Sequence, residues 1–123
     1  MGLFSFNKSK NESKINWIAL TQQEQISEAI ESSATRPVLF FKHSTRCSIS
    51  SMALNRFESE WKNESNCTIY FLDLIQFRNL SNALADTLNV QHQSPQAILV
   101  NNKLVTYHAS HSSIDVASIE DRL

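Results

Sequence analysis

Apolar residues along the chain occur both in short continuous runs and in helically spaced patterns. The runs Val38 to Phe41 and Thr68 to Leu74 have the β-prone composition of buried parallel strands. Helical spacing of apolar residues extends from Cys47 to about Asn63, and Ser44 or Thr45 is expected to cap the start of that helix. A further helical face follows the second run, made of Leu80, Ala83, Leu84 and Leu88. This order of elements predicts an α/β layer structure with parallel strands.

The two ends of this pattern add further elements. We expect an edge strand within Trp17 to Leu20, and a capping box at Thr21 to Glu24 that opens a helix. After Ser94-Pro95 the sequence predicts two strands joined by a tight turn, and then a final helix: Gln96 to Val100, Asn101 to Lys103, Leu104 to Ala109, and Ser112 to Leu123. An opening helix followed by βαβαββα is the order of the thioredoxin-like fold, whose mixed sheet of four to five strands is flanked by helices.

Length and composition limit the possibilities further. A chain of 123 residues, 41% hydrophobic and 19% charged, predicts a single domain over 15–123 after a flexible tail at 1–14. A formal charge of -1 gives no reason to expect a nucleic-acid partner. No apolar run approaches the roughly 20 residues that span a membrane, so a cytoplasmic protein is expected. The oligomeric state stays open.

The sequence lacks the usual signatures of several cofactors. The only glycine is Gly2, whereas the phosphate-binding loops of nucleotide sites need several glycines between a strand and a helix. The two cysteines and four histidines lack the paired spacing of a zinc site. We therefore expect neither a metal nor a tightly bound cofactor.

The residue with the strongest chemical signal is Cys47, which lies where a predicted strand passes into a helix. The positive end of that helix and its unpaired N–H groups are expected to stabilise a thiolate. Arg46, with Lys42 and His43 shortly before it, adds positive potential. The polar residues around Cys47 also argue against a buried structural cysteine. We therefore predict that Cys47 is a redox-active nucleophile.

The chain offers no obvious second thiol for Cys47. Cys47 to Ser50 forms a Cys-x-x-Ser motif, and the Ser50 hydroxyl cannot form a disulfide. A helix of about 16 residues rises roughly 24 Å, which would place Cys67 beyond the roughly 7 Å Cα separation that a disulfide tolerates. We therefore expect Cys67 to be structural, and Cys47 to work through a monothiol mechanism.

Pro95 begins a predicted strand after Ser94. In thioredoxin-fold proteins this place holds a cis-proline beside the active cysteine, and the backbone before it pairs with an extended substrate. We therefore expect a cis peptide bond at Pro95, and substrate contacts from Ser94 and Pro95.

Other cysteine chemistries fit less well. A cysteine phosphatase needs Cys-x5-Arg, but the sixth residue after Cys47 is Ala53, and the spacing of a peroxiredoxin site is also absent. A cysteine hydrolase needs an imidazole base, and Asp73 could lie near the thiol. The histidines open to the role of base are His43, His92, His108 and His111.

The stretch from Phe41 to Leu54, together with Ser94 to Gln96 and Tyr107 to His111, closely resembles the YtxJ-like monothiol bacilliredoxin family of the thioredoxin-like superfamily. The resemblance implies an oxidoreductase of bacterial redox and stress homeostasis, with bacillithiol as co-substrate and S-thiolated proteins as clients. Many members have Pro after the cysteine, where this chain has Ser48.

The resemblance also implies a reaction and residue roles. Cys47 would take bacillithiol from a protein mixed disulfide, and a second thiol or a reductase would then free Cys47. Thr45, Arg46, Ser50 and His43 would support the thiolate. The alternatives are a glutaredoxin-like protein that uses another low-molecular-weight thiol, and a non-catalytic binding module or redox-sensing stress adaptor.

Overall fold

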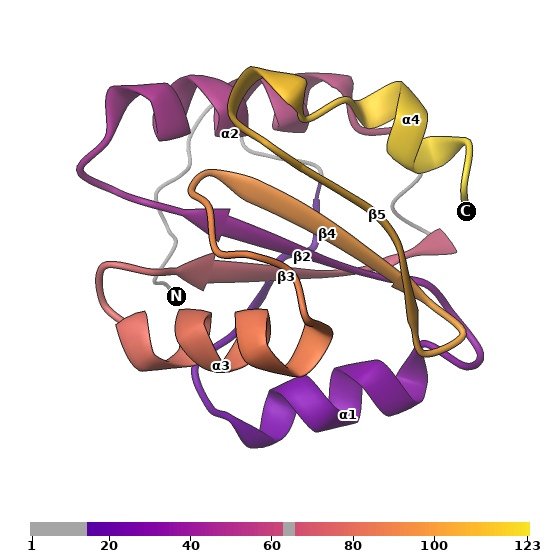
Figure 1. Ribbon diagram of the computed structural model, residues 1–123. Coiled ribbons are helices and arrows are strands. Elements are labelled where there is room, and N and C mark those ends of the chain that lie inside the picture. Colours follow the sequence, from indigo (N-terminus) through magenta and orange to yellow (C-terminus); the bar gives the residue numbers. More distant parts are fainter. Residues whose placement is uncertain (1–14, 63–65) are drawn as a thin grey trace.

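A computed structural model describes residues 15–62 and 66–123 of the chain (Figure 1). The tail expected at 1–14 lies outside the described residues, whereas the helix expected to reach about Asn63 ends at Glu60, because the backbone turns extended at Trp61. The helices and strands alternate as the sequence predicted, and their bounds are β1 (Ile18–Ala19), α1 (Glu24–Ser32), β2 (Val38–His43), α2 (Ser48–Glu60), β3 (Thr68–Asp73), α3 (Arg78–Leu88), β4 (Gln96–Asn101), β5 (Leu104–Ser110), a 3-10 turn (His111–Ser113) and α4 (Val116–Glu120).

The five strands form one mixed sheet in the order β1-β3-β2-β4-β5. β2 lies at its centre, parallel to β3 with Val38 opposite Thr68, and antiparallel to β4 with Lys42 opposite Gln96. β1 pairs with β3 in parallel at one edge, and β5 closes the other edge in antiparallel pairing with β4. This arrangement confirms the predicted thioredoxin-like fold.

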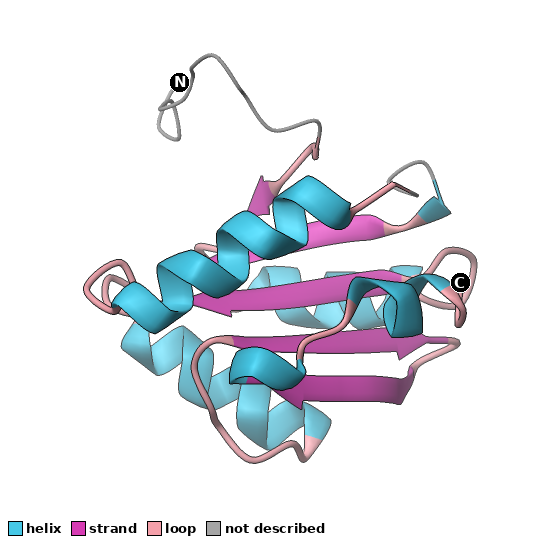
Figure 2. Cartoon of the chain, turned by 90° about the horizontal axis from the view of Figure 1, so that it is seen from above, coloured by secondary structure: helices cyan, strands magenta, loops and turns pink. Residues whose placement is uncertain are grey.

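Helices cover both faces of the sheet. In Figure 2, α2 and α4 lie in front of the strands, and α1 and α3 lie behind them. Successive residues of a strand face opposite sides, so β2 sends Leu39 and Phe41 toward α2 and α4, and Val38 and Phe40 toward α1 and α3. All six residues of β2 are buried, which explains why its sequence is an apolar run rather than an alternating pattern.

At two other places, the start of α1 and the last helix, the structure also differs from the sequence prediction. No capping box forms at Thr21, because Gln23 is the N-cap without a side-chain bond, while the Gln25 side chain accepts from the N–H groups of Thr21 and Gln22. The predicted final helix is also interrupted. The 3-10 turn ends near Ile114, and Asp115 then caps α4 by accepting from the Ser118 N–H at 3.2 Å.

The predicted hairpin turn between β4 and β5 is confirmed. Asn102 and Lys103 have φ of 55° and 68°, the left-handed values that a two-residue hairpin turn requires. The turn is fixed to the rest of the fold by Ser33, whose carbonyl accepts from the Asn102 N–H and whose hydroxyl accepts from the Lys103 N–H, both at 2.8 Å.

Phe57 holds α2 to the sheet. Its ring lies 5.1 Å from those of Phe41 and Trp61 and 5.8 Å from that of Trp17, measured between centroids. We predict that Phe57→Ala lowers the free energy of unfolding by about 3–5 kcal/mol, because it leaves a cavity among these rings. Urea unfolding followed by tryptophan fluorescence measures the change. Met52→Ala on the same helix is the control, since Met52 is 68% exposed and should cost less than about 0.5 kcal/mol.

Candidate functional site

Cys47 is the N-cap residue of α2, at the end of the loop that leaves β2. Its N–H donates to the Ser44 carbonyl at 3.2 Å, which closes a tight turn, and its carbonyl accepts the first helical bond, from the Ser51 N–H at 3.1 Å. The N–H groups of the first helical turn therefore have no partner within the helix and lie at the end of α2 where Cys47 stands. No acidic residue lies in that turn. Cys47 is also partly exposed, so this place suits a reacting thiolate.

The Ser50 side chain anchors the loop that carries Cys47. Its hydroxyl accepts from the Ser44 N–H at 3.0 Å and lies 2.9 Å from His43 Nδ1. Ser50 is completely buried. The expected cap from Ser44 or Thr45 does not form, because Cys47 is the N-cap and no side chain accepts from the first helical turn there. Ser50 thus fixes the geometry of the loop.

His43 lies under the loop, with 6% of its surface exposed. Burial lowers the pKa of His43, and the carboxylate of Asp73 opposes this effect only in part. The neutral ring is therefore favoured, with Nδ1 in hydrogen-bond contact with the Ser50 hydroxyl. Asp73 itself caps the next turn, where its Oδ1 accepts from the Ile75 N–H at 3.1 Å. His43 thus supports the loop that carries Cys47, and Asp73 supports the turn that follows β3.

Ser94 and Pro95 lie at the same end of the sheet as the Cys47 loop. The peptide bond between them is cis, as predicted. Because Lys42 pairs with Gln96 in antiparallel register, Pro95 precedes β4 at the end of the sheet where the Cys47 loop leaves β2. The Pro95 carbonyl accepts from the His111 N–H at 3.0 Å, and the Ser94 hydroxyl is buried without a hydrogen-bond partner among the described residues.

The other side of the loop borders an apolar groove of about 460 Å³. Thr45 and His43 line it at the loop, and Thr45 is exposed. Its apolar lining comes from β1, β3 and α2, including Trp17, Leu54 and Phe71. Arg46 is exposed beside Cys47, and further along α2 two large apolar side chains are also exposed, Ile49 at 56% and Met52 at 68%. Apolar surface thus occurs both in this groove and on the exposed side of α2, a feature that sequence patterns alone did not indicate.

Cys67 lies at the opposite end of the sheet from Cys47. It immediately precedes Thr68, which pairs with the first residue of β2, whereas Cys47 follows the last residue of that strand. Cys67 is buried in the core, and this burial raises the pKa of its thiol to about 12. Both cysteines are free. The structure therefore supports the prediction that Cys67 is structural.

Lys42 does not contribute to the environment of Cys47 as expected. Because side chains alternate along β2, Lys42 faces α3, on the opposite side of the sheet from α2. Its Nζ lies 3.3 Å from the Ser81 carbonyl and 3.2 Å from His92 Nδ1. The sequence suggested that Lys42 belonged to the loop, but the strand continues through it to His43.

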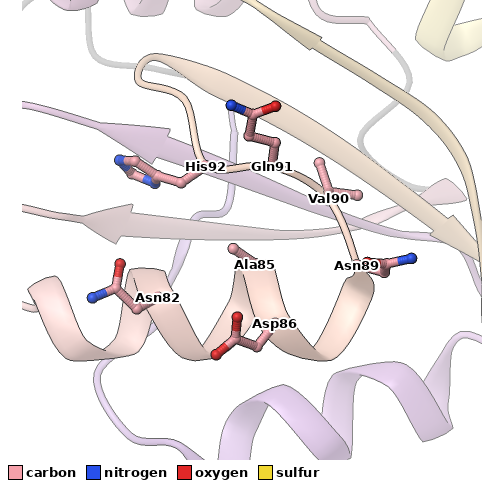
Figure 3. Close-up of a pocket in the computed structure, with 7 residues that line it drawn as sticks. All are labelled: Asn82, Ala85, Asp86, Asn89, Val90, Gln91 and His92. Atoms are coloured by element: carbon pink, nitrogen blue, oxygen red, sulfur yellow. The ribbon is translucent and has the colours of Figure 1, made fainter.

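A larger pocket, of about 690 Å³, lies between α3 and the segment that follows it (Figure 3). Its lining is mostly polar, with His92 at one end and Asn89 at the other. None of its lining residues belongs to the loop that carries Cys47. Two further findings concern residues 15–62 and 66–123: no three His, Cys, Asp or Glu side chains gather to hold a metal ion, and no helix is long and apolar enough to cross a membrane.

Comparison with known proteins agrees with this geometry. The chain is similar to a solved structure with a thioredoxin fold, proposed to be an oxidoreductase, at 32% identity and a TM-score of 0.73, over 85% of this chain and 91% of the other. Two plant thioredoxins share the fold: thioredoxin O2 from Arabidopsis thaliana (17% identity, TM-score 0.65, 86% and 90% of the two chains) and thioredoxin NaTrxh from Nicotiana alata (14%, 0.67, 94% and 95%).

Fold and site together define a thioredoxin-fold protein with a redox function. The family profile described as monothiol bacilliredoxin BrxC matches residues 18–119. The chain therefore belongs to the monothiol bacilliredoxin family, as its sequence motifs predicted.

The geometry of Ser50 gives a prediction about stability. We expect Ser50→Ala to lower the free energy of unfolding by about 1–3 kcal/mol, because the Ser44 N–H and the His43 ring lose their buried partner. Ser51→Ala is the matched control, since Ser51 is exposed on the same helix turn and should change stability little. Equal urea midpoints for the two variants would contradict the anchoring role of Ser50.

The burial of His43 gives a prediction about pH. Its folded-state pKa lies below the unfolded value of about 6.5, so the unfolded chain binds the proton more readily in this range. Stability is therefore fully present above about pH 6.5 and falls as the pH drops toward the lower folded pKa. We expect His43→Asn to flatten the decline in unfolding free energy between about pH 7 and 5. An unchanged slope would show that His43 is not held neutral.

Proposed function

We propose that Cys47 carries out monothiol exchange and removes bacillithiol from S-bacillithiolated proteins. The observation that carries this proposal is a single partly exposed thiol at the start of α2, with a buried hydroxyl, Ser50, at the position where a second thiol would resolve it. Membership of the monothiol bacilliredoxin family supports the same reaction. The protein would act where low-molecular-weight thiols keep cysteines reduced, which indicates the cytoplasm.

The exchange needs two displacements at sulfur. The Cys47 thiolate attacks the bacillithiol sulfur of the mixed disulfide, so that a Cys47–bacillithiol bond forms while the protein sulfur leaves as a thiolate and takes a proton from water. A second bacillithiol then attacks the bacillithiol sulfur of this adduct, which gives bacillithiol disulfide and frees Cys47. A separate reductase could supply the same two electrons. The location of Cys67 at the other end of the sheet supports an external second thiol.

The surroundings of Cys47 suit a protein substrate. Ser94 and Pro95 lie at the end of the sheet where the loop leaves β2; the backbone of Ser94 would pair with an extended client segment, and the Pro95 ring would lie beside it. Exposed Ile49 and Met52 provide apolar surface for the client next to the thiol. Exposed Arg46, which precedes Cys47, would attract the carboxylates of bacillithiol, and Thr45 borders the neighbouring groove.

The test is mass spectrometry after incubation with a bacillithiolated protein. We expect wild type and Cys67→Ser to gain one bacillithiol and to release the client thiol, whereas Cys47→Ser gains none. Addition of free bacillithiol should then restore the unmodified mass of wild type. Failure of wild type to take up bacillithiol would contradict the proposed reaction.

The same assay separates the alternatives. A glutaredoxin-like protein would react faster with the glutathionylated form of the same client than with the bacillithiolated form. A redox-sensing adaptor would form an adduct at Cys47 that free bacillithiol does not remove. Either result would replace the proposed activity with the corresponding alternative.

A further inference from the structure

The segment that leads into Pro95 is held by a buried polar network on the far face of the sheet from Cys47. Lys42 Nζ lies 3.2 Å from His92 Nδ1 and 3.3 Å from the Ser81 carbonyl, and the Ser81 hydroxyl also lies 3.2 Å from His92 Nδ1. Lys42 and Ser81 are both completely buried. The imidazole of His92 thus lies between a strand cation and a helix hydroxyl.

Gln96 holds the same segment from the neighbouring strand. Its Nε2 donates to the Gln91 carbonyl at 3.0 Å, and its Oε1 accepts from the Gln93 N–H at 3.4 Å. Lys42 and Gln96 are direct partners across β2 and β4. The side chains of this cross-strand pair therefore fix the segment just before Ser94 and Pro95, which is Gln91, His92 and Gln93.

A purely structural role does not account for a charged side chain at position 42. A buried ammonium group is expensive, and in the described part of the chain Lys42 forms no ion pair. Burial lowers the pKa of Lys42 to about 8, so the group is mainly charged at neutral pH. Methionine would fill the same space without this cost. The charged group is therefore better explained by its hydrogen bond to the His92 ring.

We propose that Lys42 is a positioning residue for exchange at Cys47: it holds neutral His92, which fixes the segment that presents Ser94 and Pro95 to the client chain, and protonation of His92 releases this hold. The proposal rests on the proposed function. A protonated ring has no free lone pair at Nδ1, so it can no longer accept from Lys42 and instead repels the ammonium group.

The charged groups around Lys42 and His92 agree with a release of His92 on protonation. Burial is the main cause that lowers the pKa of His92, and the positive charges of Lys42 and Arg78 lower it further. Asp86 of α3 lines the same pocket as His92. From β3, Tyr70 stacks on Phe40 on this face, where burial and the nearby Glu28 raise its pKa, so it stays neutral. His92 is therefore neutral at pH 7 and gains its proton only at more acidic pH.

Three variants test the proposal. His92→Asn keeps an acceptor near the Nδ1 position and cannot be protonated in this range, His92→Leu removes the acceptor, and Lys42→Met removes the donor. For each we would measure, from about pH 5.5 to 8, the rate of bacillithiol transfer from a bacillithiolated protein and the rate of Cys47 alkylation by iodoacetamide. Alkylation needs no bound client, so the ratio of the two rates cancels the thiolate fraction of Cys47.

We expect alkylation to be alike in all four proteins. The transfer-to-alkylation ratio should fall roughly tenfold in His92→Leu and Lys42→Met, the size of effect expected for a lost hydrogen bond to a charged group. In wild type the ratio should decline toward pH 5.5, and in His92→Asn it should stay high. Ratios equal in all four proteins, or a decline in His92→Asn that matches wild type, would overturn the proposal.

A failure of the proposed function would look different. Wild type would then be alkylated at Cys47 yet take no bacillithiol. In that case amide hydrogen exchange of residues 91–94 decides whether Lys42 fixes this segment. Protection should fall in His92→Leu and Lys42→Met and persist in His92→Asn, and equal protection in all three would overturn the role of Lys42.

Discussion

The site depends on the hydroxyl of Ser50, buried beneath the loop that carries Cys47. By accepting from the Ser44 N–H and bonding the His43 ring, it fixes the chain between the end of β2 and the start of α2. The thiol then lies at the N-terminus of a 13-residue helix, where backbone N–H groups and the helix dipole favour negative charge. A second thiol at position 50 would be a redox partner. The serine is instead a structural anchor, which suits a monothiol reaction.

The central strand β2 links the two faces of the fold. Its penultimate residue, Lys42, faces α3 and holds His92, while its last residue, His43, faces α2 and bonds Ser50. The same strand pairs with β4, which begins directly after Pro95. Alternation along β2 thus directs one polar side chain toward the loop that carries Cys47 and the other toward the segment that precedes Pro95.

The sequence predicted most of the fold because its strands are continuous apolar runs and its helices have clear periodicity. It also predicted the position of Cys47 at the start of α2 and the cis bond at Pro95 before β4, since a strand–helix junction and a strand start can be located from local patterns. It missed the side-chain anchors. Ser50 looked like a replaced thiol, and Lys42 looked like a loop residue, because a strand buried on both faces gives no alternation that would show where a polar side chain points. The groove beside Thr45 combines β1, β3 and α2, which only the tertiary structure brings together.

The central claim is that Cys47 is the accessible, reactive thiol and Cys67 is not. Brief treatment of the folded protein with iodoacetamide at neutral pH, followed by peptide mass mapping, tests this claim directly. The account predicts that the peptide containing Cys47 is modified rapidly, and that the peptide containing Cys67 is modified only when urea unfolds the chain. Equal modification of both cysteines in the folded protein, or protection of Cys47, would contradict it.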